Sequence, residues 1–331
     1  MKSLVRKFNS LFGADMGGPL IAFLAVMLIF GLAADNFISA ATFGSVAFQL
    51  PELGLLTLAM LLPLLTGGIN LAVTFTANLS GLAAAWVLQA NGGVDAPASA
   101  FALACCAALA SGAAAGALTG LAIAYTRAHP ILITLSMMIF LRGLGEFLTR
   151  GGDVSGFPAY MAPIGHGSLL GIPIPLLIFI VCVAAWHVLL TRSKLGFGLL
   201  MIGSNMEAAQ YSGLNTRRIL VLVYTLSGVM CAIAGIIMLA RFNSVRVGHG
   251  ESYLLITVLA AFLGGVNPFG GFGRVLPVFV ALIVLQLLSS GLNLMGANQH
   301  LATALWGVLM IVVMAARSFV STNRIFSRKK N

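Results

Sequence analysis

The stretch that decides the fold is GSNMEAAQYSGLNTRRILVLVYTLSGVMCAIAGII, residues 203–237. It begins as a polar segment with one acidic residue, Glu207, passes two arginines and continues as a long apolar run. The polar part holds good helix formers, with Ser204 or Asn205 placed to cap the start and Gly213 placed to end the turn. The apolar part is long enough for a membrane helix, which needs roughly 20 residues. The stretch therefore predicts a short surface helix joined to a membrane-spanning helix.

The composition extends this interpretation to the whole chain. Of the 331 residues, 60% are hydrophobic and only 8% are charged, whereas soluble domains carry roughly a quarter charged residues. This predicts an integral membrane protein, with the lipid bilayer as its surroundings. The net charge of +10 does not indicate nucleic acid, because the basic residues lie in the tails and in the joints between apolar runs.

The apolar runs predict an all-α, polytopic membrane helix bundle of about ten transmembrane helices. Only the five residues TGGIN separate the second run from the third, so these two form either two spans or one broken element. The ten expected spans are 19–34, 46–66, 69–89, 99–125, 131–149, 172–191, 219–240, 251–265, 274–291 and 300–316.

The basic residues predict the orientation. With ten spans both termini lie on one side, and that side holds fourteen of the 18 basic residues, which marks it as cytosolic. These are Lys2, Arg6, Lys7, Arg317, Arg324, Arg328, Lys329 and Lys330 in the tails and Arg127, Arg192, Lys194, Arg217, Arg218 and Arg274 in the joints. We expect a cytosolic tail over 1–18, a transmembrane domain over 19–316 with a cytosolic loop at about 192–218, and a basic cytosolic tail over 317–331.

Charged residues inside the expected spans need a partner or water. Glu52 follows Pro51 near the middle of the second span, where an unpaired carboxylate costs several kcal/mol. It faces the bundle or a cavity in a structural or a functional role, unless the span begins after Pro51 and Glu52 lies at the interface. Arg142 and Glu146 stand four apart on one helix face and are expected to pair. They form a structural clamp or, alternatively, line a solute path.

No arrangement of residues predicts catalysis, a metal site or nucleotide binding. The five histidines are scattered singly and the four cysteines lie inside apolar runs, so no metal-ligand spacing occurs. The glycines at 270, 271 and 273 are not followed by the Lys-Ser or Lys-Thr of a phosphate loop. We therefore expect neither an enzyme nor a cofactor bound by this chain.

The stretch 203–237 resembles the coupling-helix region of ATP-binding-cassette importer permeases of the ribose and simple-sugar branch, which is related to branched-chain amino acid permeases. In that family the region reads roughly Gly-x-Asn-x-Glu-Ala-Ala-x-x-Ser-Gly-Ile-Asn, then two basic residues and a Tyr-x-x-Ser-Gly helix. The matching residues here are Gly203, Asn205, Glu207, Ala208, Ala209, Ser212, Gly213, Asn215, Arg217, Arg218, Tyr224, Ser227 and Gly228.

Three further stretches are similar to the same family, so the resemblance covers about residues 50–316. They are GGINLAV at 67–73, HPILITLSMMIFLRGLGEFLT at 129–149, and LGGVNPFGGFGRVLP at 263–277 with the later SSGLNLMG. The chain also departs from the pattern. Asn70 stands where the family usually has aspartate, Ala72 and Thr74 replace its serine and glycine, and Ala261 and Phe262 replace Val-Ile.

The resemblance implies a permease subunit of the bacterial inner membrane that moves a sugar or sugar-like solute by alternating access. It implies three partners: a cytosolic ATPase subunit that uses the ATP, a periplasmic solute-binding protein, and a second permease subunit, either a copy of this chain or a paralogue. The coupling interface with the ATPase would comprise Glu207, Ala208, Ala209, Ser212, Gly213 and Asn215.

Sugars are held by aromatic faces together with hydrogen-bonding side chains, although aromatic residues in a helix bundle also serve simply as packing. The candidates for the translocation path are Asn70, Phe75, Thr76, Asn78, Phe140 and Glu52. Near the outer end, Asn293, Asn298 and Gln299 are candidates for contact with the periplasmic partner.

Other function classes fit less well. An ion-coupled secondary transporter would favour several acidic residues within the spans, and only Glu52 and Glu146 are available. An intramembrane enzyme would need a nucleophile and a base, or metal ligands, at one depth. A structural scaffold would not need the glycine-rich breaks at 66–70 and 264–273.

Overall fold

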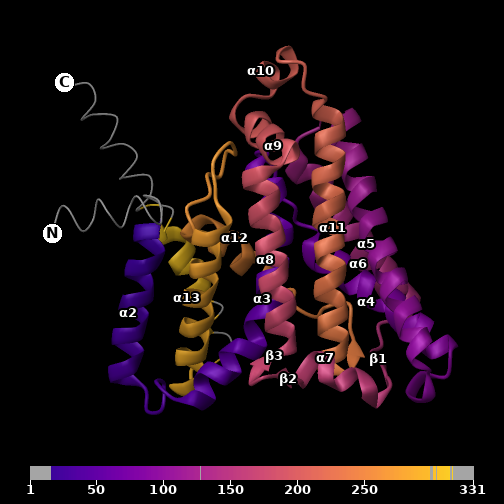
Figure 1. Cartoon of the computed structure of the whole chain (residues 1–331), viewed down its shortest axis with the longest axis vertical. Coiled ribbons are helices and arrows are strands. Elements are labelled where there is room, and N and C mark those ends of the chain that lie inside the picture. The colour runs from indigo at the N-terminus through magenta and orange to yellow at the C-terminus, as the bar shows by residue number, and fades with distance from the viewer. Residues whose placement is uncertain (1–15, 127, 299–300, 303, 314, 316–331) are drawn as a thin grey trace.

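The computed structural model describes residues 16–126, 128–298, 301–302, 304–313 and 315. These residues form a helix bundle with short elements at both ends (Figure 1). The long helices are α2 (Gly17–Ala33), α3 (Ala40–Leu65), α4 (Val73–Ala90), α5 (Ala98–Thr126), α6 (Pro130–Thr149), α8 (Ile174–Arg192), α11 (Thr216–Phe242) and α13 (Val275–Leu294). The shorter helices are α7 (Ala162–His166), α9 (Lys194–Ser204), α10 (Met206–Tyr211) and α12 (Tyr253–Leu263), with the 3-10 turns η2 (Gly93–Asp95) and η3 (Ala159–Met161).

The expected helical membrane bundle is confirmed. Within the described residues, six helices are long and apolar enough to cross a membrane: α3, α5, α6, α8, α11 and α13. The other four expected spans coincide with the 18-residue helix α4 and with the shorter apolar helices α2, α12 and Ala304–Val313. The basic tails, Arg127 and Gln299 lie outside the described residues.

The centre of the bundle is α3. Its most apolar 18-residue window is 89% buried, because leucines cover all of its faces from Leu53 to Leu65. Beside it, α11 packs against α3, α4 and α5. Glycines on α5 allow this close approach: a Cβ at Gly112 or Gly116 would overlap the backbone of α11 at Gly228 or Tyr224.

Two breaks interrupt the helical pattern. The first separates α3 from α4 over residues 66–72, so TGGIN joins two helices and does not lie within one continuous helix. The second separates α12 from α13, where Gly265, Gly270 and Gly271 have φ of +91°, +85° and +78°. The two breaks touch, since Gly271 N donates to Leu65 O over 2.9 Å.

The expected loop at 192–218 holds two helices, whereas we expected one. Helix α9 precedes α10, and Asn205 both ends the first and caps the second. Ser204 is the last residue of α9, which decides between the two expected caps. Helix α10 lies beyond the bundle, at the opposite end from the short strands (Figure 1).

At the other end, the loop after α6 is tied to the loop after α11. Strand β1 (Val154–Ser155) pairs antiparallel with β4 (Ser244–Val245), and β2 (Ser168–Leu169) pairs with β3 (Ile172–Pro173). Helix α11 begins directly after α10 and ends beside β4, so it connects the two ends of the molecule (Figure 1).

Candidate functional site

Helix α10 is fixed at both of its ends. Asn205 is extended (φ −161°, ψ 110°), and its Oδ1 accepts a hydrogen bond from Ala208 N over 2.9 Å. After the helix, Gly213 takes a φ of +82°, and Asn215 Oδ1 accepts from Arg218 N over 3.0 Å to cap α11. These caps fix the junctions of α10 with α9 and α11.

The residues expected to form the coupling interface divide into two groups. Glu207, Ala208, Ser212, Gly213 and Asn215 are exposed, and Glu207 lies in the first turn of the helix. Ala209 is fully buried in the main core, so in this structure it anchors α10 and does not form a surface.

An exposed aromatic residue on the same helix, Tyr211, was not among the predicted site residues. Tyr211 is 92% exposed and follows Glu207 by four residues, which places both on one helix face. Tyrosine is enriched among the residues that contribute most to protein–protein binding. The spacing from Glu207 was the signal that would have found it.

Directly beneath α10, α9 packs against both helix breaks. At Gly203 a Cβ would overlap Leu65 O, at the end of α3, and Gly271 N, in the second break. Across the same junction, a Cβ at Gly67 would meet Phe269 O at 3.0 Å. Glycine at 203 is therefore required by a three-way backbone contact that connects α10 to both breaks.

Asn70 is buried and holds the first break against α11. Its Nδ2 donates to Ser227 Oγ over 3.0 Å, and its Oδ1 accepts from Ala72 N over 3.1 Å. Ser227 Oγ itself donates to Ala59 O over 2.7 Å. Both ends of the Asn70 amide are thus engaged within the protein.

Glu52 is also buried and is paired with a distant residue. Arg241 Nη1, on α11, lies 2.9 Å from Glu52 Oε1, an ion pair without the alignment of a hydrogen bond. Tyr253 Oη donates to Glu52 Oε2 over a long 3.5 Å. Because α3 runs through Pro51, Glu52 lies inside the helix and not at its start. These contacts favour the structural interpretation of Glu52.

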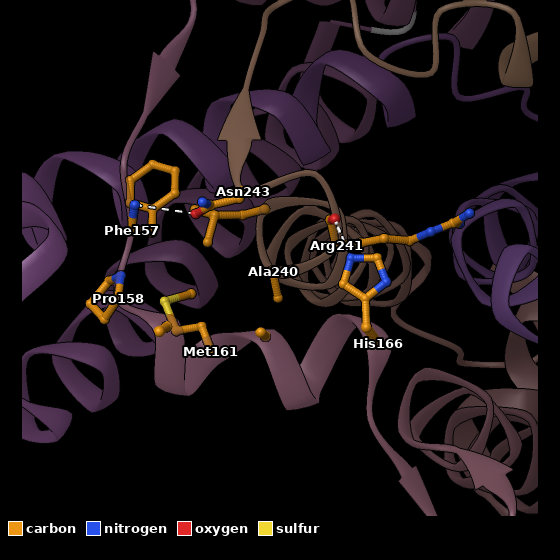
Figure 2. A pocket seen from close by; sticks show the side chains of 10 residues that line it. Phe157, Pro158, Met161, His166, Ala240, Arg241 and Asn243 are labelled. Atoms are coloured by element: carbon orange, nitrogen blue, oxygen red, sulfur yellow. Dashed lines mark hydrogen bonds between the residues drawn. The ribbon is translucent and has the colours of Figure 1, made fainter.

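A small pocket lies beside the end of α11 (Figure 2). His166 Nε2 shares a hydrogen bond with Arg241 O over 2.8 Å, and Phe157 N donates to Asn243 Oδ1 over 3.2 Å. Figure 2 shows the Arg241 side chain pointing away from the pocket. The pocket has a volume of about 100 Å³, which is below the roughly 300–1,000 Å³ of ligand pockets. We interpret it as a packing joint.

A larger pocket, called the charged pocket below, lies between α6 and the loop that joins β4 to α12. Its volume is about 490 Å³, and its polar side chains are Arg142, Glu146, Thr149, Arg246, His249 and Glu251. Arg142 makes two ion pairs there, 3.0 Å from Glu146 Oε1 and 3.1 Å from Glu251 Oε1.

Helix α4 supports the charged pocket from beneath. The Arg142 guanidinium lies 5.7 Å from the centre of the Phe75 ring. Asn78 Nδ2 donates to Val247 O and, over 3.1 Å, to His249 O, which fixes the loop. Burial lowers the pKa of His249; the nearby Arg246 lowers it further, and Asp153 opposes both effects.

The remaining candidates lie elsewhere. Thr76 is buried in α4, and Phe140 is 58% exposed on α6, beside an open apolar groove with Leu132 and Ser136. Of the predicted residues, Arg142 and Glu146 line the charged pocket. Phe75 and Asn78 lie behind it, in contact with Arg142 and with the loop. Among the described residues, no three His, Cys, Asp or Glu side chains are placed to hold a metal ion.

Comparison of the sequence with known proteins finds transport permeases, both among family models and among individual relatives. The family described as "Branched-chain amino acid transport system / permease component" matches residues 42–314. The ribose import permease protein RbsC of Escherichia coli (strain K12) is 33% identical over 300 residues, covering 89% of this chain and 91% of the relative. The autoinducer 2 import system permease protein LsrD of Salmonella typhi is 31% identical over 324 residues, covering 93% and 95%. No solved structure matches the chain at comparable significance.

Proposed function

We infer the function of this chain from its family: it belongs to the permease components of branched-chain amino acid-type transport systems, and it is a membrane-spanning importer subunit. We propose that it works within an ATP-binding-cassette importer and forms the path of a sugar or sugar-like solute. ATP is hydrolysed by a separate partner subunit.

The relatives favour a sugar-like solute. Although the family description names branched-chain amino acids, relatives that cover about nine-tenths of this chain are named for ribose and for autoinducer 2.

The proposed topology has ten spans and both termini in the cytosol. The end of the molecule that carries α10 also carries Arg192, Lys194, Arg217 and Arg218 at its helix ends. Such a concentration of basic residues marks the cytosolic side. The end with β1 and β4 then faces the periplasm.

The position of α10 is the observation that carries the proposal. A short helix, capped at both ends and standing beyond the bundle, can transmit a push to α9 and α11 without deforming. We propose that an ATPase subunit docks on the exposed face with Glu207 and Tyr211. Gly203 then passes the movement to the two helix breaks, and the spans tilt as rigid bodies between outward-open and inward-open states.

The complete importer has two permease subunits and a periplasmic binding protein. The second permease subunit is either a copy of this chain or a paralogue. The binding protein delivers the solute to the end with β1 and β4, where the charged pocket opens.

Uptake by cells tests the proposal. The chain is produced, with its ATPase and binding-protein partners, in bacteria that lack their own permeases for ribose and autoinducer 2. We expect accumulation of labelled ribose or autoinducer 2 that is lost when the ATPase cannot hydrolyse ATP. Accumulation that continues without a working ATPase would instead support ion-coupled secondary transport.

A further inference from the structure

The open face of α6 carries charge at a depth where lipid would not tolerate it. The apolar window of α6 is only 17% buried, and the Arg142 and Glu146 side chains are 49% and 51% exposed. Arg142 precedes the last residue, Thr149, by seven positions, which places it about 10 Å inside the helix end at 1.5 Å per residue. A charge facing hydrocarbon there costs several kcal/mol. This face of α6 therefore faces water or another protein chain, and not lipid.

The charged pocket on this face lies at the end of the molecule away from α10. Helix α11 starts next to α10 and reaches β4 at its far end. Strand β4 pairs with β1, which follows α6 directly. The pocket thus opens on the side from which an imported solute arrives.

The chemistry of the pocket suits neutral, polyhydroxylated molecules. The guanidinium of Arg142 is a planar array of donors, and the carboxylates of Glu146 and Glu251 are acceptors only. The guanidinium lies 3.0 Å from Glu146 Oε1 and 3.1 Å from Glu251 Oε1. Neighbouring hydroxyl groups on a sugar both donate and accept, so they bridge such a pair. The volume of about 490 Å³ falls within the range for small-molecule pockets.

The pocket walls are held in place before any ligand binds. The Phe75 ring lies beneath the Arg142 guanidinium, and Asn78 Nδ2 donates hydrogen bonds to two carbonyl oxygens of the loop, those of Val247 and His249. The Arg142–Glu251 ion pair then joins the loop to α6. Walls fixed in this way lower the cost of ordering on binding.

We propose that the charged pocket is the first solute-binding site of this chain, and that it takes a neutral polyol through Arg142, Glu146 and Glu251. The inference rests on the proposed function and adds the site and the residues that bind the solute. Phe75 and Asn78 are positioning residues, because they act through Arg142 and the loop.

Cysteine protection in the assembled importer tests the inference. Thr149→Cys places a thiol in the pocket wall, and Asp95→Cys places one on an exposed turn at the same end, outside the pocket. A membrane-impermeant maleimide is applied with and without ribose, and then with and without autoinducer 2. We expect whichever solute the importer takes up to slow labelling of Thr149→Cys and to leave Asp95→Cys unchanged.

A second arm uses Glu251→Gln and, as a charge control, Asp95→Asn. Loss of a charged hydrogen-bonding partner weakens binding about 10- to 100-fold, so Glu251→Gln should require correspondingly more solute for the same protection. Asp95→Asn should behave as wild type. If the importer takes up either solute while that solute does not slow labelling of Thr149→Cys, the inference is wrong and the proposed function stands. The same conclusion holds if protection occurs but Glu251→Gln needs no more solute than the wild type for it. If the wild-type importer takes up neither solute, the proposed sugar class fails, and the inference fails with it.

Discussion

Glu52 and Arg241 form an ion pair inside the bundle, with Oε1 and Nη1 2.9 Å apart. The Glu52 side chain is 1% exposed and that of Arg241 is 18% exposed. Arg241 Nη1 also donates to Phe48 O over 3.3 Å, so α11 is tied to α3 by both a charge and a backbone contact. The pair explains how a carboxylate is accommodated in the central helix.

Replacing one partner of this pair should destabilise the protein strongly. Glu52→Leu leaves the partly buried Arg241 without its counter-ion, and removing one member of a buried pair costs about 3–5 kcal/mol. The double variant Glu52→Leu/Arg241→Met should recover much of that loss, because neither charge remains. Thermal unfolding in mild detergent measures both. An equal loss of thermal stability in the single and double variants would show that the unpaired charge of Arg241 does not cause the destabilisation.

Asn70→Asp should destabilise the chain, even though aspartate is usual in the family at this position. Ser227 Oγ donates to Ala59 O and therefore accepts from the Asn70 amide. An ionised aspartate has no proton to donate, so it would keep the bond from Ala72 N but would force the Ser227 hydroxyl to turn away from Ala59 O in order to donate to it, and it would bury a charge in place of a neutral amide. We expect a lower thermal midpoint for Asn70→Asp, with partial rescue by Ser227→Ala, which removes the oxygen that an aspartate would face. An unchanged midpoint would mean that the break is held by other contacts.

Gly203→Ala should damage the junction between α9 and the two breaks. The added methyl group would overlap Leu65 O and Gly271 N, which are backbone atoms and cannot step aside. Gly143→Ala, on α6, is the matched control, because a Cβ there meets nothing within 4 Å. We expect a large loss of folded protein or of uptake for Gly203→Ala, measured by size-exclusion chromatography and solute accumulation. Equal amounts of folded protein and equal uptake for the two variants would contradict the close backbone contact at Gly203.

Acid should lower the stability of the folded protein through His249, which lies in the loop between β4 and α12. Burial lowers the pKa of His249 in the folded protein, so the unfolded chain takes up the proton first as pH falls. The contribution to stability is complete above the ordinary pKa of about 6.5 and declines below it. Thermal midpoints measured between about pH 5 and pH 8 should fall at the acid end, and His249→Gln should reduce that fall. A thermal midpoint of the wild type that rises on acidification would contradict this prediction.

The sequence was most informative where a feature depends on local pattern. Helix α10 and its cap follow from Asn205 and the alanines after it, and the Arg142–Glu146 contact follows from spacing on one helix. The spans follow from the number of apolar residues that cross a bilayer. Six of the helices also satisfy that length and hydropathy in the described structure.

Contacts between distant segments could not be predicted in this way. No periodic pattern joins Glu52 to Arg241, or Arg142 to Glu251, because each pair is brought together only by packing of separate helices. Helix α9 was not predicted, because residues 192–218 were assigned to a cytosolic loop from their basic residues. The apolar residues of α9 are buried against the bundle, a contact that depends on the tertiary fold. The break before α4 was visible as TGGIN, but its contact with Gly271 depends on the tertiary fold.

The central claim is that α10 docks an ATPase subunit, and co-purification tests it most directly. The tagged chain is isolated in mild detergent as wild type, as Glu207→Arg and as Asp95→Arg, which reverses an exposed charge at the opposite end. We predict that a cassette ATPase accompanies the wild type and Asp95→Arg and is lost from Glu207→Arg, while all three chains remain folded. An ATPase that stays bound to Glu207→Arg as it does to the wild type would contradict docking through this face of α10.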